Sequence, residues 1–175
     1  SRDTRLVEAS VGAGLWDTAL DRGALFAAAQ CLGLAQRSVD LAVAYAKERQ
    51  QFGKPIGSYQ AIKHLLATAQ VKIEFARPVV HAASAVAAQG SPQSRARVSH
   101  AKIVAAEAAD LAARTAIQVH GAMGYSWEVD VHLFLKRALA LTYAWGVPAA
   151  HRARIEARVF GLPTGADQLF SHEAV

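Results

Sequence analysis

Two short segments of the chain combine residue types that can hold an anionic ligand. Residues 48–53 read Glu-Arg-Gln-Gln-Phe-Gly, which places Arg49 and two amides beside an aromatic residue and a glycine. Residues 118–125 place Gln118 ahead of a turn that contains glycines. An arginine can pair with phosphate oxygens, and small residues let backbone amides approach a ligand. The same residues also serve ordinary capping and turns, so the segments alone leave a binding role and a structural role open.

Other kinds of chemistry find little support in the residue pattern. None of the seven histidines stands in an H-E-x-x-H or a paired Glu-x-x-His arrangement, so we predict no metal site. Cys31 is the only cysteine and lies in an apolar helical pattern, which favours a core residue over a disulfide or zinc ligand. The chain contains neither a phosphate-loop motif nor a G-x-S-x-G motif. The cysteine usage leads us to expect a reducing, cytoplasmic location.

The charge pattern argues against nucleic-acid and membrane partners. The formal net charge is +5, but the arginines are scattered and no aromatic residues alternate with them, so we predict no nucleic-acid binding. Charged residues interrupt every apolar run, so we predict no membrane span. The first five residues are polar and show no signal-peptide pattern. The chain begins with serine, which leads us to expect a piece of a longer protein.

Apolar residues at helical spacing predict an all-α protein, and no segment shows a strand pattern. Asp17 and Ser126 are predicted N-caps, Gly121 is a predicted C-cap, and Pro78 is expected to kink its helix. Long helices joined by short turns predict an up-down-up-down four-helix bundle with a short extra helix at the C-terminal end. The predicted helices cover residues 20–49, 59–88, 94–120, 126–144 and 148–161.

The two motif segments also carry a family resemblance. Residues 45–56, followed by Gln60 and Ala67, resemble the acyl-CoA dehydrogenase signature YAxxRxQFGxPI…Q…LA, and residues 118–125 resemble that family's QxxGGxGY turn. Residues 33–37 also fit the helix that leads to the first motif. The resemblance is to the C-terminal helical bundle of a three-part enzyme. It implies an upstream linker over residues 1–16, the bundle over residues 17–161 and a tail over residues 162–175.

The resemblance implies contacts to FAD across a subunit interface. By this resemblance Arg49 meets the pyrophosphate of a neighbouring subunit's FAD, and the second motif lies along its ADP portion. Ala122 departs from the family's second glycine, which narrows the close approach of the backbone. The cofactor-binding residues carried over in this way are Arg49, Gln51, Phe52, Gln118, Gly121 and Ala122.

The family's catalytic base has no counterpart in this chain. Dehydrogenation requires a base that removes the proton alpha to the thioester while the flavin accepts a hydride. Most members carry a glutamate late in the bundle, where this chain has Trp145, and some carry it on the first helix, where this chain has Gly23. We therefore predict no catalytic residue in this chain. A displaced base remains open, and Asp21 or Glu128 would then have to reach the flavin.

The resemblance therefore implies a supporting subunit of an acyl-CoA dehydrogenase, similar to bacterial heteromers of which some act on steroid side chains. The alternatives are a homomeric dehydrogenase with a displaced base, a related flavoprotein with a CoA-type or nitroalkane-type substrate, and a non-enzymatic oligomerisation bundle. The complete enzyme would act on an acyl-CoA and pass electrons to an electron-transfer flavoprotein. We expect the isolated chain to form oligomers without FAD, since the family's middle β-domain holds the flavin ring.

Overall fold

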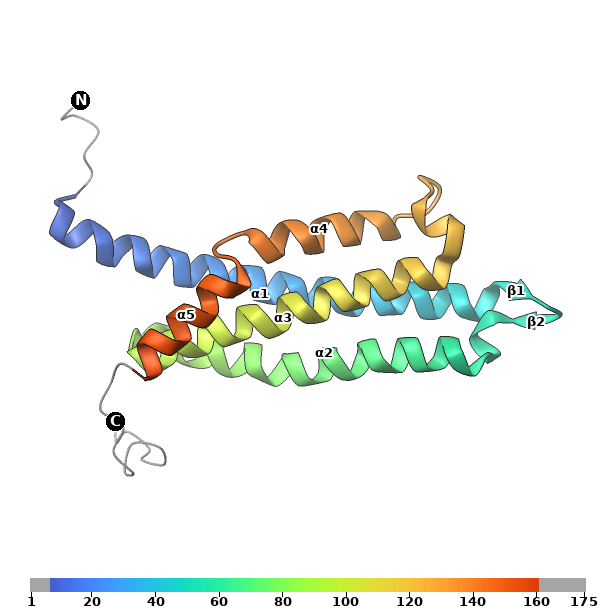
Figure 1. The fold of residues 1–175 in the computed structure, drawn as a ribbon, viewed down its shortest axis with the longest axis horizontal. Coiled ribbons are helices and arrows are strands. Elements are labelled where there is room, and N and C mark those ends of the chain that lie inside the picture. Colours follow the sequence, from blue (N-terminus) through green and yellow to red (C-terminus); the bar gives the residue numbers. More distant parts are fainter. Residues whose placement is uncertain (1–6, 161–175) are drawn as a thin grey trace, which may run out of the picture.

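The computed structural model describes residues 7–160 and is a bundle of antiparallel helices (Figure 1). Helices α1 to α4 alternate in direction, and α5 packs across the end of the bundle where α4 finishes. The predicted all-α up-down-up-down architecture with an extra C-terminal helix is confirmed. The helices are α1 (Ala9–Glu48), α2 (Gln60–Val86), α3 (Pro92–His120), α4 (Val131–Tyr143) and α5 (Pro148–Val159).

Helix α3 lies at the centre and packs against all four other helices. Its buried face is dominated by alanine, whose small side chain allows the helix backbones to approach closely. The facing stripe of α1 includes Leu32, Val39 and Ala46, which recur at the helical spacing on which the all-α prediction rests. Cys31 is fully buried in the same core, and burial raises the pKa of its thiol to about 11. The thiol is therefore a packing group at neutral pH.

Several element ends differ from the predictions. Helix α1 begins at Ala9, so the predicted upstream linker is helical from that residue on and Asp17 lies inside the helix. Ser126 does not cap α4, which begins at Val131; its hydroxyl instead accepts the backbone N–H of Glu128 within the preceding turn. Gly121 does end α3, with a φ of 61°. The predicted tail at residues 162–175 lies outside the described residues.

A short hairpin follows α1, although no strand was predicted. Strand β1 (Gln50–Gln51) pairs antiparallel with β2 (Lys54–Pro55). Phe52 and Gly53 form the two-residue turn with φ values of 53° and 81°, the positive-φ pattern of a hairpin turn of type I′. The hydroxyl of Tyr59 donates to the carbonyl of Gln51 at 3.1 Å and ties the hairpin to the start of α2. The hairpin thus holds the first motif in a fixed shape.

Helix α2 is continuous through Pro78, the residue expected to kink it. A 3-10 turn, η3 (Ala87–Gln89), and a left-handed Gly90 then lead to α3. The side chain of Ser91 caps α3 by accepting the backbone N–H of Ser94 at 3.1 Å. Within residues 7–160, no helix is both long and apolar enough to cross a membrane.

Candidate functional site

The two motif segments meet in one pocket at the hairpin end of the bundle. The pocket has a volume of about 560 Å³ and lies between α1, the hairpin, the start of α2 and the 3-10 helix η4 (Gly121–Tyr125). Most of the other side chains that line it are aliphatic or aromatic. Five of the six predicted cofactor residues line it, namely Arg49, Gln51, Phe52, Gly121 and Ala122.

Gln118 is the predicted cofactor residue that does not line this pocket. Its side chain is exposed on α3, while its backbone carbonyl accepts the N–H of Gly121. The structure therefore gives Gln118 a place in the helix end that shapes the turn.

Arg49 supplies the positive charge of the pocket. Its guanidinium is exposed and makes no hydrogen bond or ion pair with any residue between 7 and 160. Phe52, at the hairpin tip, is 92% exposed, and its ring meets that of Tyr59 edge to face with the centroids 6.5 Å apart. An uncompensated guanidinium beside flat apolar walls fits a ligand that carries both phosphate and an aromatic ring.

The floor of the pocket holds two residues that sequence reasoning did not assign to it. Tyr45 and His120 stack with ring centroids 4.2 Å apart, and Nδ1 of His120 lies 2.7 Å from the carbonyl oxygen of Ala116. Tyr45 lies four residues before Arg49, the C-cap residue of α1, and its carbonyl oxygen accepts the backbone N–H of Arg49. Tyr45 is the first residue of the motif at residues 45–56, and its position four residues before Arg49 could have indicated that it lies near the pocket.

The two positions where the resemblance places the catalytic base, Gly23 and Trp145, meet away from this pocket, at the turn between α4 and α5. The indole of Trp145 lies directly on Gly23 of α1, because a Cβ built on Gly23 would fall 2.1 Å from Cδ2 of the indole. Trp145 itself has a φ of 62°, in the left-handed region that bulky residues rarely adopt. Neither position offers a group that can accept a proton from a substrate.

Buried polar groups hold this turn from beneath. The ammonium of Lys102 on α3 is 1% exposed and donates to the carbonyl oxygens of Leu141 and Thr142 at 2.7 and 3.0 Å. A cation at the C-terminal end of a helix satisfies carbonyls that the helix leaves unpaired. On the other side, a Cβ on Gly146 would lie 2.9 Å from Nε2 of His151, so α5 also packs closely against the turn.

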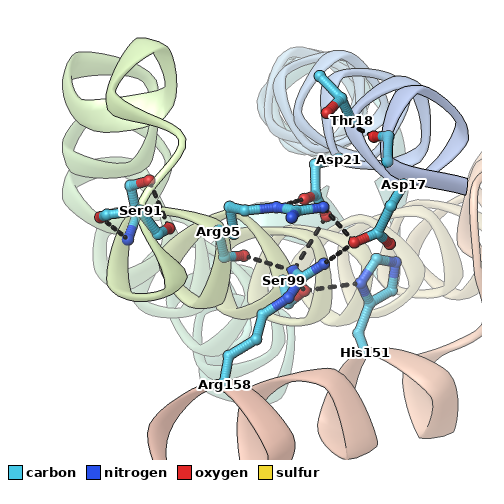
Figure 2. A network of polar contacts seen from close by, with 10 residues as sticks. Asp17, Thr18, Asp21, Ser91, Arg95, Ser99, His151 and Arg158 are labelled. Atoms are coloured by element: carbon cyan, nitrogen blue, oxygen red, sulfur yellow. Dashed lines mark hydrogen bonds and ion pairs between the residues drawn. The ribbon is translucent and has the colours of Figure 1, made fainter. Parts of the chain in front are cut away.

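His151 is fully buried and lies next to a charged network (Figure 2). Its Nδ1 is 3.3 Å from the hydroxyl of Ser99. Burial, together with the charges of Arg154 and Lys102, lowers the pKa of His151 from 6.5 to about 4, and Asp21 offsets this only in part. The imidazole is therefore neutral in the folded chain at neutral pH.

We expect the free energy of unfolding to fall as the pH drops below about 6.5. In that range His151 is protonated in the unfolded chain but stays neutral in the folded chain. The stability that neutral His151 contributes is fully present above pH 6.5, its ordinary pKa, and is lost progressively as the pH falls toward about 4, its pKa in the folded chain. About 2 kcal/mol should disappear between about pH 7.5 and pH 5. Urea unfolding at a series of pH values measures this slope. The slope should flatten in His151→Gln and persist in His100→Gln, where the replaced histidine is exposed; equal slopes in both variants would contradict the assignment.

Asp21, one of the two acidic residues considered as a displaced base, belongs to the charged network (Figure 2). Its carboxylate accepts from Nε of Arg95 at 2.5 Å and from Nη1 of Arg158 at 3.0 Å, and its side chain is 9% exposed. Asp17 pairs with the same two arginines. The network joins α1, α3 and α5, and it occupies both oxygens of Asp21.

Glu128, the other acidic residue, lies in the turn between η4 and α4. It is exposed, and the whole of α4, about 20 Å of helix, separates it from the turn that carries Trp145. Neither Asp21 nor Glu128 therefore stands at the base positions.

Comparison with known proteins identifies the architecture that contains these features. Residues 11–160 match the model of the acyl-CoA dehydrogenase C-terminal domain. The chain belongs to the acyl-CoA dehydrogenase family. Members of this family are FAD flavoproteins, so the phosphate-bearing aromatic ligand that suits the pocket has a counterpart in the family's cofactor.

The relatives of this family member are longer proteins. It is 42% identical over 147 residues to acyl-CoA dehydrogenase IpdE2 of Mycolicibacterium smegmatis, a match that covers 84% of this chain and 44% of the relative. Butyryl-CoA dehydrogenase from Megasphaera elsdenii aligns with a TM-score of 0.76 at 33% identity, covering 81% of this chain and 37% of that one. The ChsE4–ChsE5 complex from Mycobacterium tuberculosis aligns with a TM-score of 0.76 at 28% identity, covering 86% and 40%. The chain thus spans less than half the length of these relatives.

Proposed function

We propose that the chain is the C-terminal domain of a supporting acyl-CoA dehydrogenase subunit. In this proposal its pocket binds the ADP and pyrophosphate portion of a neighbouring subunit's FAD. The neighbouring subunit supplies the carboxylate that removes the alpha proton of an acyl-CoA. The observation that supports the proposal is a pocket lined by Arg49 and by the turn of the second motif, together with Trp145 and Gly23 at the positions where the resemblance places the base.

The geometry of α1 supports a pocket that serves another subunit. Gly23 lies within α1 and Arg49 is the C-cap residue that follows it, and the stretch between them corresponds to about 40 Å at about 1.5 Å per residue. One extended dinucleotide cannot bridge that distance. The pocket at the hairpin end of α1 and the base positions, which lie at Gly23 farther back along the helix, would therefore face two different flavins.

The chemistry that FAD supplies when bound is acceptance of a hydride from the substrate. The residues of this chain would hold the cofactor without taking part in that step. Arg49 would pair with the pyrophosphate, and the exposed ring of Phe52 would contact the ligand from the hairpin tip. Gly121 would let the backbone of η4 approach it, and the methyl group of Ala122 would narrow that approach.

A supporting role is also consistent with a two-protein assembly among the structural relatives. The ChsE4–ChsE5 structure is a complex of two proteins, and this chain aligns with one of its chains. A homomeric enzyme with a displaced base would instead need Asp21 or Glu128 near the base positions. Asp21 is engaged by two arginines, and Glu128 lies at the opposite end of α4. We therefore favour a hetero-oligomer in which a base-bearing homologue completes the enzyme.

Replacing Arg49 with alanine should remove most of the FAD from the complete protein co-purified with a base-bearing homologue. Loss of a charge-assisted contact to phosphate should weaken FAD binding by about tenfold to a hundredfold. Flavin absorbance per complex after gel filtration measures the effect. Arg37→Ala is the matched control, since it removes the same charge from an exposed position on α1 outside the pocket. Unchanged flavin content in Arg49→Ala would refute the role of the pocket, and turnover of an acyl-CoA without any partner would refute the supporting role.

A further inference from the structure

Gly23 is an unexpected residue in the middle of α1. Glycine in a helix interior costs about 1 kcal/mol relative to alanine. The residue is buried, and its missing side chain is replaced by the indole of Trp145. Three indole atoms, Cδ2, Cε3 and Cε2, lie 2.1, 2.4 and 2.6 Å from the position that a Cβ on Gly23 would take. Any side chain at position 23 would have to displace the ring.

Trp145 is equally unexpected in its own turn. Its φ of 62° and the φ of 117° at Gly146 place two consecutive residues in conformations that most side chains disfavour. A tryptophan held there persists only where the surrounding contacts fix it. The contacts are present on each side of the turn. Gly23 receives the indole, Lys102 holds the end of α4, and His151 packs against Gly146.

The two unfavourable features meet in a single contact, so each accounts for the other. We propose that Gly23 and Trp145 form a matched pair, in which the indole clamps the α4–α5 turn onto α1 and turns both family base positions into one apolar wall. A carboxylate cannot return to position 23 while Trp145 is present. That the wall would face a substrate rests on the proposed function, whereas the contact between Gly23 and Trp145 does not depend on it.

The pair predicts a strong coupling between substitutions at the two positions. Gly23→Ala alone should lower the midpoint of thermal unfolding of the chain by about 5 °C or more, because the added methyl expels the indole. In the Trp145→Gly background the same substitution should leave the midpoint unchanged or raise it, because alanine is the better helix former. Gly33→Ala is the matched control inside α1, since no atom lies within 4 Å of its added Cβ. It should raise the midpoint by about 2 °C in both backgrounds.

Tryptophan fluorescence provides a second measurement that reports the position of the ring. The chain has three tryptophans: Trp16 and Trp127 are 63% and 79% exposed, and Trp145, whose ring lies on Gly23, is 47% exposed. Changing Trp16 and Trp127 to phenylalanine leaves Trp145 as the sole reporter. Gly23→Ala and Gly23→Glu should each shift its emission to longer wavelength and increase its quenching by acrylamide, whereas Gly33→Ala should change neither.

The outcomes separate this inference from the proposed function. If Gly23→Ala alone does not fold but the Gly23→Ala/Trp145→Gly double variant does, the pair is supported. Equal effects of Gly23→Ala in both backgrounds, failure of the double variant to fold, or an unchanged Trp145 emission would overturn it. The flavin measurement with Arg49→Ala depends on the opposite end of α1, so either idea can fail while the other stands.

Discussion

Replacing Asp21 with asparagine is expected to lower the free energy of unfolding by about 3 kcal/mol, the largest loss that we foresee for a single polar residue in this chain. The substitution preserves the shape of the side chain but leaves Arg95 and Arg158 with only Asp17 as a counter-charge. Uncompensated charge in a partly buried network is costly because the arginines have lost much of their hydration. Urea unfolding followed by circular dichroism measures the change.

The control for Asp21→Asn is Asp17→Asn in the same network. The side chain of Asp17 is 43% exposed, whereas that of Asp21 is 9% exposed. Water can therefore solvate the arginines more easily where the Asp17 carboxylate is lost than where the Asp21 carboxylate is lost. We expect a loss of about 1 kcal/mol or less for Asp17→Asn. Equal losses for the two variants would mean that burial does not set the strength of this network.

The second large effect is expected at Gly124, the glycine that lets η4 fold back over α3. A Cβ at this position would lie 2.8 Å from the carbonyl oxygen of Ile117 and 3.1 Å from its Cα. Both are backbone atoms of α3 and cannot swing aside as a flexible side chain would. Gly124→Ala should therefore cost about 3 kcal/mol of stability and shift the turn that carries Gly121 and Ala122.

Ala122→Gly is the control for Gly124→Ala, because it changes an exposed residue of the same turn by one methyl group. It should alter the free energy of unfolding by less than about 1 kcal/mol. In the complete protein, Gly124→Ala should also reduce FAD content, since η4 forms one wall of the pocket. Normal stability and flavin content in Gly124→Ala would show that η4 can move away from α3.

The long helices were predictable because their buried faces repeat at helical spacing. In α2, for example, Ile73 and Val80 stand seven residues apart and are both buried. The first turns of α1 were missed for a related reason. Gly12 and Gly14 lower the helix propensity there, and Leu15 and Trp16 are 54% and 63% exposed, so that stretch has no buried stripe to detect.

The hairpin escaped prediction because its strands are two residues long, too short for an alternating pattern to show. The N-cap prediction at Ser126 failed because its hydroxyl serves a local turn, a competing use of the same side chain. Such choices depend on which backbone N–H lies within reach, and residue types alone do not decide that.

The residues of the proposed cofactor pocket could be grouped from the sequence because each motif is a continuous segment. The proposed loss of the catalytic base rested on two separate positions, Gly23 and Trp145. The indole of Trp145 fills the space beside Gly23. This is a tertiary contact between the α4–α5 turn and α1, and no local sequence pattern predicts it. The same holds for the bond from Arg158 to Asp21, which joins residues 137 positions apart.

The length of α1 has an evolutionary consequence. Residues far apart with no shared partners contribute nearly independently to stability and binding. In the proposed function the anion pocket and Gly23 are separated by about 40 Å along α1, so a mutation at one of the two sites has little effect on the other and selection can act on each separately. After a gene duplication, one copy can lose its carboxylate and still be retained for its hold on a sister protein's cofactor. A division of labour between paralogues then requires no new surface, only the loss of one chemical group.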